Sequence, residues 1–453
     1  MPSIFMISLG CAKNLVDAET TLGETLGGEF TLSLDPEAAD LIIINTCGFI
    51  EEARDEARET IRGCLELKRR AGGRPRVVAT GCWAERDPKG VLAEFPGLDA
   101  VWGLRTPASL REAIGKLEAG AGGISGLGAR DGAREGARLI STPPSYAYLR
   151  LSDGCDNRCA YCAIPSIRGR LASRDPGRII DEAKVLEEGG IKELILIGQD
   201  TTAYGRDLGR PGASLPRLLE KLLKAVRLPR LRLLYTHPAH LEADVLDLML
   251  GQPRLCGYVD FPAQHASESI LRRMGRGYGR ERVLELLDRF AAGGLTVRGT
   301  LLLGFPGETE ADFLEALDLA ASGAFQHLGA FAYSPEPGTP AFDLDGRVPP
   351  AEAARRRDAV LASQQSRAFA WLESRIGGRE EILVDRLDGK GRPIGRSVRE
   401  APDVDGTIRL SGSRAAPGEI IDACVTRREG YDLLADAGGR RHGKPREGRG
   451  EKA

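Results

Sequence analysis

The chain has 453 residues, enough for two to four domains, and its 42% hydrophobic content is ordinary for a globular protein. Its formal net charge of −2 predicts no bulk attraction to nucleic acid or to an anionic membrane. The longest purely apolar runs, such as Leu41–Ile44, are far shorter than the roughly 20 residues of a membrane-spanning helix. The first residues, Met1 to Ser3, lack the basic charge of a secretory signal. In such a chain the nine cysteines predict metal or redox chemistry rather than disulfides.

The first hundred residues alternate short β-type runs with helical patterns. The predicted strands are Ser3–Ser8, Ala39–Asn45 and Arg76–Thr80, and the predicted helices are Val16–Leu26 and Glu51–Arg70. This alternation predicts an α/β domain with a parallel sheet and crossover helices, over residues 1–118. Glycines crowd the stretch from Gly120 to Gly136, which predicts a flexible linker over residues 119–143.

A second α/β region is predicted over residues 144–372. Its predicted strands are Tyr146–Ser152, Glu193–Gly198, Arg230–Tyr235, Gly257–Phe261, Thr296–Gly304 and His327–Tyr333. The helical segments between them include Arg178–Glu188, Leu215–Val226, Ala243–Leu250, Arg280–Ala292 and Glu310–Ala321. Six such units indicate either a partial (β/α) barrel or an open doubly wound sheet, and periodicity alone leaves both possible.

The last part of the chain changes in character. A long helix is predicted at Pro350–Ile376, and short strands with Gly, Pro and Asp turns follow from Glu381 to Ala435. These strands predict a small antiparallel β-barrel over residues 373–437. Basic residues and glycines dominate residues 438–453, which we expect to be a disordered basic tail.

Three cysteines, Cys155, Cys159 and Cys162, form a C-x3-C-x2-C cluster directly after the strand Tyr146–Ser152. This position predicts that their thiols lie at the carboxyl end of the first barrel strand, where α/β active sites form. Three thiolates do not complete the tetrahedron of a zinc ion, and no further cysteine or histidine follows within fifteen residues. A cubane iron–sulfur cluster with three protein ligands instead keeps one iron open for another molecule.

This cysteine motif, with the aromatic Tyr161 before its last cysteine, resembles that of the radical S-adenosylmethionine (SAM) enzymes. In that superfamily the open iron chelates the methionine part of SAM, and one electron from the cluster releases a 5′-deoxyadenosyl radical. The resemblance implies that Cys155, Cys159 and Cys162 hold a 4Fe–4S cluster. It also implies that Tyr161 lies beside the nucleotide.

A later glycine-containing run, Gly299–Glu308, resembles the fifth barrel strand of the same superfamily, which packs near the adenosine. By this resemblance Gly299, Gly304 and Glu308 are candidate SAM-binding residues. Gln199 and Asp200 end the second predicted barrel strand at the active-site face, where either a cofactor or substrate contact or a loop-capping role is expected.

Three further cysteines, Cys11, Cys47 and Cys82, each follow a predicted strand of the first domain. In a parallel sheet these strand ends share one edge, so the three thiols can meet in one crevice. A glycine flanks each of them and allows the backbone to approach a bulky cofactor; the alternative is buried free thiols. The remaining cysteines, Cys64, Cys256 and Cys424, show no such regularity and are interpreted as structural.

Residues 1 to about 435 resemble the methylthiotransferases, radical SAM enzymes with an N-terminal second-cluster domain and a C-terminal TRAM domain. In that family Cys11, Cys47 and Cys82 match three cysteines that hold a second 4Fe–4S cluster. The chain is most similar to the branch that modifies an aspartate of small-subunit ribosomal protein S-twelve. The runs behind this similarity are residues 8–17, 45–50, 198–205, 264–265 and 401–406.

The resemblance implies a division of work in which the barrel cluster generates the radical and the second cluster presents sulfur. One SAM would methylate that sulfur, and a second would supply the radical that attacks the aspartate β-carbon. The expected cofactors are two 4Fe–4S clusters and SAM, and no side chain is assigned as a catalytic residue. Expected partners are the ribosomal protein, free or on the ribosome, and an electron donor, without a membrane. The expected location is the cytoplasm, where metal-bound thiols stay reduced.

Direct RNA binding stays open, since TRAM-type domains often bind RNA but acidic and basic residues nearly balance between residues 374 and 436. We expect Asp403 and Asp405 to lie in one exposed turn suited to a basic ribosomal protein. Two alternative functions are the tRNA-adenosine branch of the same family and an iron–sulfur electron-transfer or scaffold protein. An electron-transfer or scaffold protein would gain nothing from an open iron.

Overall fold

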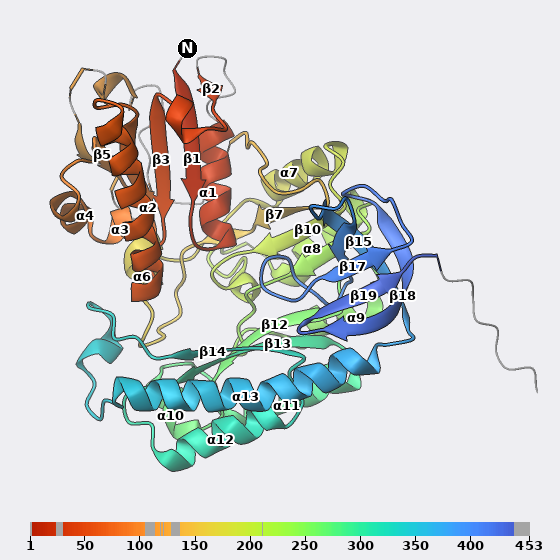
Figure 1. Ribbon diagram of the computed structural model, residues 1–453. Helices are drawn as coiled ribbons and strands as arrows, with labels where there is room; N and C mark the ends of the chain where they lie inside the picture. The colour runs from red at the N-terminus through yellow and green to blue at the C-terminus, as the bar shows by residue number, and fades with distance from the viewer. Residues whose placement is uncertain are drawn as a thin grey trace, which may run out of the picture.

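The computed structural model describes residues 2–23, 30–104, 114–117, 119–120, 122–127, 136–210 and 212–438. Its three regions are an N-terminal α/β layer, a central partial barrel and a C-terminal β-barrel (Figure 1). The basic tail predicted at residues 438–453 lies, apart from Gly438, outside the described residues.

The N-terminal region is a parallel six-stranded sheet in the order β2-β1-β3-β4-β5-β6, which confirms the predicted α/β arrangement. Its central strand is apolar along most of its length because a parallel sheet is covered on both faces. The strands are β1 (Ser3–Ser8), β2 (Thr31–Leu32), β3 (Leu41–Thr46), β4 (Arg76–Gly81), β5 (Ala100–Trp102) and β6 (Gly123–Ser125). The helical segments are α1 (Ala12–Gly23), η2 (Pro36–Ala38), α2 (Glu51–Arg70), α3 (Cys82–Arg86) and α4 (Pro88–Glu94).

One strand of this sheet lies where the sequence predicted a linker. Gly123–Ser125 form β6 and pair in parallel with Ala100–Trp102 of β5. Strand pairing uses backbone groups only, so a segment rich in glycine can add a short edge strand without contributing to the core. Three residues between glycines carry no periodic signal, which is why the sequence pattern did not indicate this strand.

The central region is a partial barrel of six parallel strands. Their order in space follows their order in the chain, as β7-β10-β11 in one sheet and β12-β13-β14 in another. A doubly wound sheet would reverse its order at a switch point, so this arrangement resolves the alternative that periodicity left open. The strands are β7 (Tyr146–Arg150), β10 (Glu193–Ile197), β11 (Arg230–Leu233), β12 (Tyr258–Gln264), β13 (Thr296–Leu303) and β14 (His327–Ala332).

Helices cover the outer face of these strands, and the large apolar core lies between the two layers (Figure 1). These helices are α7 (Pro176–Glu188), α8 (Leu215–Ala225), α9 (Ala243–Gly251), α10 (Glu268–Arg273), α11 (Arg280–Ala292), α12 (Glu310–Ala321) and α13 (Pro350–Ser374). The short helix α6 (Ile164–Arg168) packs against α3 of the N-terminal region instead. Shorter elements are η3 (Thr201–Ala203), η4 (Pro340–Asp343) and the antiparallel pair β8 (Ser152–Asp153) and β9 (Ala172–Ser173).

The C-terminal region is a closed barrel in the order β15-β16-β17-β19-β18. Its strands are β15 (Arg379–Leu387), β16 (Pro393–Arg396), β17 (Ile408–Ser411), β18 (Ile420–Glu429) and β19 (Asp432–Asp436). The predicted small barrel is confirmed, and its pairs are antiparallel except that β17 and β19 run parallel. The parallel pair closes the barrel, because the β18–β19 hairpin returns beside β17 in the same direction.

Two segments from outside the central region fill its concave face. Val16 of α1 and Ala401 of the C-terminal region share one apolar cluster with the barrel residues Tyr146 and Tyr148. The first and last regions of the chain therefore pack against the same surface of the barrel, which orients all three regions around one interior.

The pair Asp403 and Asp405, predicted to be exposed for a basic partner, has a different role. The side chain of Asp405 is fully buried and forms an ion pair of 2.6 Å with Arg298 of β13. Asp403 accepts hydrogen bonds of 3.1 Å from the hydroxyls of Tyr146 and Tyr148. Both carboxylates thus fasten the C-terminal region to the barrel. The expectation of an exposed turn holds for Asp403 and is wrong for the carboxylate of Asp405. No helix among the described residues has the length and apolar character to cross a membrane.

Candidate functional site

The first cysteine triad lies at one edge of the N-terminal sheet. Cys11 follows β1 and precedes α1, Cys47 follows β3, and Cys82 is the first residue of α3 directly after β4. These three strands are neighbours in parallel register, so their carboxyl ends are level. The thiols lie close enough for each to influence the pKa of another. The structure thus brings these predicted ligands together.

Glycines allow the cysteine-bearing backbones of this triad to approach one another. Gly10 has φ of 87°, and a Cβ on it would lie 2.7 Å from the Cβ of Cys47. A Cβ on Gly48 would lie 2.5 Å from the Cα of Trp83, next to Cys82. Any larger residue at either position would push the cysteines apart.

Asn14, which the sequence motifs included without assigning a role, links the three strand ends. Its buried amide nitrogen donates to the carbonyls of Leu9 and Thr46, each at 3.1 Å. Its oxygen accepts from the guanidinium of Arg168 at 2.8 Å and from the thiol of Cys82 at 3.3 Å. Asn14 therefore fixes the loops on both sides of the triad.

The thiols of this triad differ in how readily they ionise. Burial raises the pKa of Cys82 to about 12, although Arg168 acts in the opposite direction. Burial also raises the pKa of Cys47. At Cys11 burial is outweighed by the positive charges of Lys13 and Arg168, so its pKa lies below the ordinary value. Cys11 is therefore the thiol of this triad that most readily gives the thiolate that metal binding requires.

The second triad lies in the loop that follows β7 and β8. Cys155 donates its backbone N–H to Gly169, and Ala160, between Cys159 and Cys162, donates to Met274 at 2.8 Å. The thiols again influence one another's pKa, and burial raises the pKa of Cys155 to about 11 and of Cys162 to about 12. The loop is thus held at the carboxyl end of the first barrel strand, as the sequence predicted.

Neither triad has the spacing of a mononuclear metal site. Two thiolates on one zinc ion lie at most about 4.6 Å apart, given zinc–sulfur bonds of about 2.3 Å. Among the described residues, which include all six cysteines, neither triad has its three sulfurs within 4.8 Å of one another. The sulfurs of each triad are therefore not drawn together as in a site for a single ion. A polynuclear cluster separates its ligands more widely, and a 4Fe–4S cluster at each triad stays a prediction.

A buried arginine contacts each triad. Arg168, at the end of α6, donates to the sulfur of Cys82 at 3.4 Å and forms ion pairs with Asp17 at 2.8 Å and Asp153 at 3.1 Å. Asp153 lies two residues before Cys155, so Arg168 connects the first triad with the loop of the second. No sequence pattern indicates this link, because Arg168 is distant in the chain from Asp17 and Cys82.

Arg276, in the loop after α10, contacts the second triad. It donates to the sulfur of Cys159 at 3.0 Å and to the hydroxyls of Tyr161 at 3.1 Å and Tyr278 at 2.8 Å. It also donates to the carbonyl of Pro262 at 3.2 Å. No carboxylate of the described residues forms an ion pair with it, although its side chain is buried. Sequence analysis missed this residue too.

The predicted SAM contacts are placed as follows. Tyr161 packs edge-on against Phe305 and meets Arg276 beside the second triad. Gln199 donates to Asp153 at 3.0 Å, while its side-chain oxygen is buried without a hydrogen-bond partner. Both residues therefore lie at the cysteine loop, and their contact with SAM stays a prediction.

The residues of the fifth-strand motif have structural partners. A Cβ on Gly299 would lie 2.5 Å from the ring of Phe325, and one on Gly304 would lie 2.2 Å from the Cβ of Ala353 in α13. Glu308 is buried, accepts the backbone N–H of Gly304 at 2.6 Å and pairs with Arg356 at 2.9 Å. Close packing and turn formation account for these three residues. Their contact with SAM also stays a prediction.

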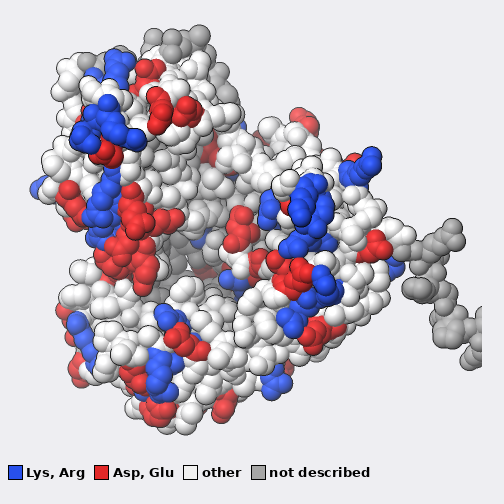
Figure 2. All heavy atoms as spheres, in the orientation of Figure 1, with Lys and Arg blue, Asp and Glu red and all other residues white. Residues whose placement is uncertain are grey.

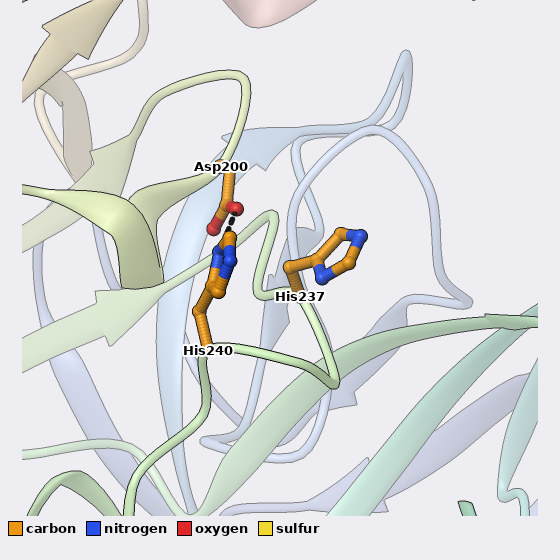
Figure 3. A group of neighbouring side chains, drawn as sticks. All are labelled: Asp200, His237 and His240. Carbon is orange, nitrogen blue, oxygen red and sulfur yellow. Dashed lines mark hydrogen bonds and ion pairs between the residues drawn. The ribbon is translucent and has the colours of Figure 1, made fainter. Parts of the chain in front are cut away.

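Asp200, His237 and His240 form a compact polar group beside the second triad (Figure 3). Asp200 caps η3, accepts from Asn157 of the cysteine loop at 2.8 Å and lies 2.7 Å from His240. The other carboxylate oxygen accepts from the hydroxyl of Thr202, so both oxygens are occupied. In Figure 3 the ring of His240 points at Asp200, whereas the ring of His237 is turned away from it. The group is a hydrogen-bonded support for the loop, which favours the loop-capping role over a metal site.

A cavity of about 580 Å³ opens beside this loop, and Cys155, Asn157, Asp200 and His240 contribute to its wall.

The three remaining cysteines lie away from both triads. Cys64 belongs to the apolar core of the N-terminal region, Cys256 to the cluster on the concave face of the barrel, and Cys424 to β18. Their environments agree with the structural interpretation.

Three segments of the chain match known protein families. Residues 149–320 match the radical SAM superfamily, residues 3–103 match the uncharacterized protein family UPF0004, and residues 376–437 match the TRAM domain. The segments lie within the predicted regions 144–372, 1–118 and 373–437, whose limits stay predictions.

Full-length relatives decide the family. A protein of Desulforudis audaxviator named ribosomal protein uS12 methylthiotransferase RimO is 40% identical over 447 residues, 95% of this chain and 96% of its own length. Proteins of the same name from Syntrophomonas wolfei and Aquifex aeolicus are 36% and 38% identical and cover 96% and 95% of this chain, and 99% and 96% of their own length. The chain belongs to the RimO family of methylthiotransferases. As a member it is a radical SAM enzyme that uses a 4Fe–4S cluster and SAM, as the cysteine motif predicted.

The fold of this RimO family member also resembles solved structures. The radical SAM methyltransferase TsrM from Kitasatospora setae, with cobalamin and a 4Fe–4S cluster bound, aligns with a TM-score of 0.54 at 18% identity. The alignment covers 75% of this chain and 74% of that protein. At this identity the likeness concerns the fold alone, and it agrees with the N-terminal α/β layer and partial barrel described above.

Proposed function

We propose that this protein adds a methylthio group to the β-carbon of an aspartate in ribosomal protein uS12, using SAM and two 4Fe–4S clusters. The observation that carries the proposal is the pair of cysteine triads, each too widely spaced for one metal ion and joined through the single side chain of Arg168. An electron carrier or scaffold protein would need neither a second triad at the barrel mouth nor the radical SAM barrel.

Six cysteines would hold the clusters in this proposal: Cys11, Cys47 and Cys82 at one site, and Cys155, Cys159 and Cys162 at the other. When bound, the barrel cluster and SAM supply a radical strong enough to remove hydrogen from an unactivated carbon, which no side chain can do. The chain itself orients the cluster loop through Arg276, Asp200 and Asn157. It also closes the concave face of the barrel with α1 and the segment around Ala401, which excludes water from a reactive centre.

The substrate would enter where the three regions meet. Figure 2 shows a hollow on the viewed face between the N-terminal region, the barrel with α13, and the C-terminal barrel. Over the C-terminal barrel, basic and acidic side chains alternate on this face rather than forming a continuous basic surface. This mixed surface supports a protein substrate over a polyanion, which would need many phosphate contacts. An external electron donor and a cytoplasmic location, where ribosomal substrates occur, belong to the same proposal.

The test uses the full chain, reconstituted with iron and sulfide without oxygen. Incubation with SAM, a reductant and either isolated uS12, ribosomes or bulk tRNA is followed by mass spectrometry of each substrate. We expect the mass of one methylthio group on an aspartate of uS12 and none on tRNA. A methylthioadenosine in tRNA with unmodified uS12 would assign the protein to the tRNA branch instead.

Iron content tests the two clusters separately. We expect about eight irons per chain, since each triad fits a cubane cluster. The triple variant Cys11→Ala, Cys47→Ala and Cys82→Ala should retain about four. A wild-type content near four would contradict the second cluster but not the radical SAM chemistry.

A further inference from the structure

Each cysteine triad has one buried arginine in contact with one of its sulfurs. Arg168 lies 3.4 Å from the sulfur of Cys82, and Arg276 lies 3.0 Å from the sulfur of Cys159. Both side chains are nearly inaccessible to solvent, with exposures of 3% and 5%. The two sites therefore share one device, a guanidinium that donates to a ligand sulfur from inside the protein.

The protein balances these two charges differently. Arg168 forms ion pairs with Asp17 and Asp153, and Asp17 is shared with the buried Arg150. Arg276 donates only to neutral oxygens, apart from the sulfur of Cys159.

A buried cation without a counter-ion carries a large desolvation cost unless an anion meets it. Among the described residues, the sulfur of Cys159 is the only group in contact with Arg276 that becomes negative when it binds a metal. The hydroxyls of Tyr161 and Tyr278 are neutral at neutral pH, because the ordinary pKa of tyrosine is about 10. Among the described residues that contact Arg276, the sulfur of Cys159 is thus the one group that could balance its charge.

From this contrast we propose that Arg276 is a positioning residue that raises the reduction potential of the cluster held by Cys155, Cys159 and Cys162. The inference rests on the proposed cluster ligands. A cluster gains one negative charge on reduction, so a nearby uncompensated positive charge stabilises its reduced form. A hydrogen bond to a ligand sulfur acts in the same direction. Arg168 has a smaller effect on its own cluster, because Asp17 and Asp153 offset its charge.

The test measures the midpoint potential of each cluster by anaerobic titration of the full-length, doubly reconstituted protein, followed by electron paramagnetic resonance. Arg276→Gln removes the charge and Arg276→Lys retains it. Arg230→Gln is the matched control, since Arg230 is also buried in the barrel and donates to the carbonyls of Arg396 and Glu381, away from both triads.

We expect Arg276→Gln to move the midpoint of the barrel cluster to a more negative potential and to leave the other cluster unchanged. Arg276→Lys should stay near the wild-type midpoint, and Arg230→Gln should move neither. 5′-Deoxyadenosine formation by Arg276→Gln should slow with a weak reductant and recover with a stronger one. A variant that had only lost structure would not recover with the stronger reductant.

Two results would overturn the role of Arg276. One is an Arg276→Gln variant with full iron content and the wild-type midpoint. The other, which decides the question if the glutamine variant does not hold its cluster, is a midpoint in Arg276→Lys that has moved despite the retained charge. Failure of the cluster assignment itself is distinguishable, because the wild-type protein would then contain about four irons or fewer and show only one titrating cluster.

Discussion

The two cysteine triads are built by different parts of the fold. Cys155, Cys159 and Cys162 lie within one loop of eight residues, whereas Cys11, Cys47 and Cys82 come from three strand ends. The loop triad is contacted by Arg276, which belongs to the same barrel and whose charge no carboxylate of the described residues balances. The strand-end triad is contacted by Arg168 of the central region, whose charge is balanced by Asp17 of the N-terminal region and Asp153 of the central region. The compensated site is therefore part of a domain junction, while the uncompensated site is specialised for the charge of its cluster.

The largest expected difference between the triads concerns product formation. Cys159→Ala should abolish 5′-deoxyadenosine formation, because the barrel cluster would lose a ligand and with it the reduction of SAM. Cys47→Ala should retain that cleavage while it loses the methylthio product. Both products can be followed by liquid chromatography and mass spectrometry in one reaction. A Cys47→Ala variant that still forms methylthiolated product at the wild-type rate would contradict the sulfur-presenting role.

The second prediction compares the stability cost of the two arginines. Arg168→Ala removes one guanidinium from the buried carboxylates of Asp17 and Asp153, which keep Arg150 among their partners, so we expect a loss of about 3–5 kcal/mol in the free energy of unfolding. Arg276→Ala leaves no carboxylate without its partner, so its loss in the free energy of unfolding should be smaller. Urea unfolding of the metal-free variants measures both values. Equal losses would show that charge compensation does not distinguish the two sites.

The third prediction concerns the close approach at the strand-end triad. Gly10→Ala places a Cβ 2.7 Å from that of Cys47 at a positive φ, so the second cluster should not assemble. Iron content should fall from about eight to about four while 5′-deoxyadenosine formation continues. Gly72→Ala is the control, because Gly72 also has a positive φ but open space around it. It should keep all of its iron.

The smallest expected effect concerns the support of the loop triad. Burial opposes ionisation of Asp200, but the hydrogen bond with His240, the proximity of His237 and the bond from Thr202 hold its pKa at about 2. Because this pKa lies below the unfolded value of 3.8, the carboxylate adds stability above pH 4 and loses it as the pH falls toward 2. Asp200→Asn should lose roughly 1–2 kcal/mol at neutral pH and flatten the acid dependence. Acid unfolding of the metal-free protein and of the variant measures this difference. If both lose stability in the same way as the pH falls, the supporting role of Asp200 is excluded.

Much of the architecture could be predicted because it depends on local patterns. The helices Glu51–Arg70, Arg280–Ala292 and Glu310–Ala321 have the bounds that their apolar spacing indicated. Both triads could be predicted as well, since parallel strands end at a common edge and each cysteine follows a strand.

The features that sequence analysis missed depend on contacts between distant residues. Arg168 meets Asp17 across 151 positions of the chain, and Arg298 meets Asp405 across 107. An arginine in a loop has the same sequence pattern whether it faces solvent or a buried sulfur. For the same reason Asp405 seemed suited to an external partner, although its partner is the barrel of its own chain. Only the three-dimensional packing of the regions separates these cases.

The ion pair between Asp17 and Arg168 has a consequence for the protein's biosynthesis. Asp17 and Asn14 leave the ribosome before their partner Arg168 exists, and at 5–20 residues per second the delay is roughly 8–30 s. During that interval Asn14 has only its partners in the N-terminal region, among them the carbonyls of Leu9 and Thr46. The closing segment around Ala401 is made later still. The N-terminal region therefore has to hold α1 in place on its own until the barrel and the segment around Ala401 have been made.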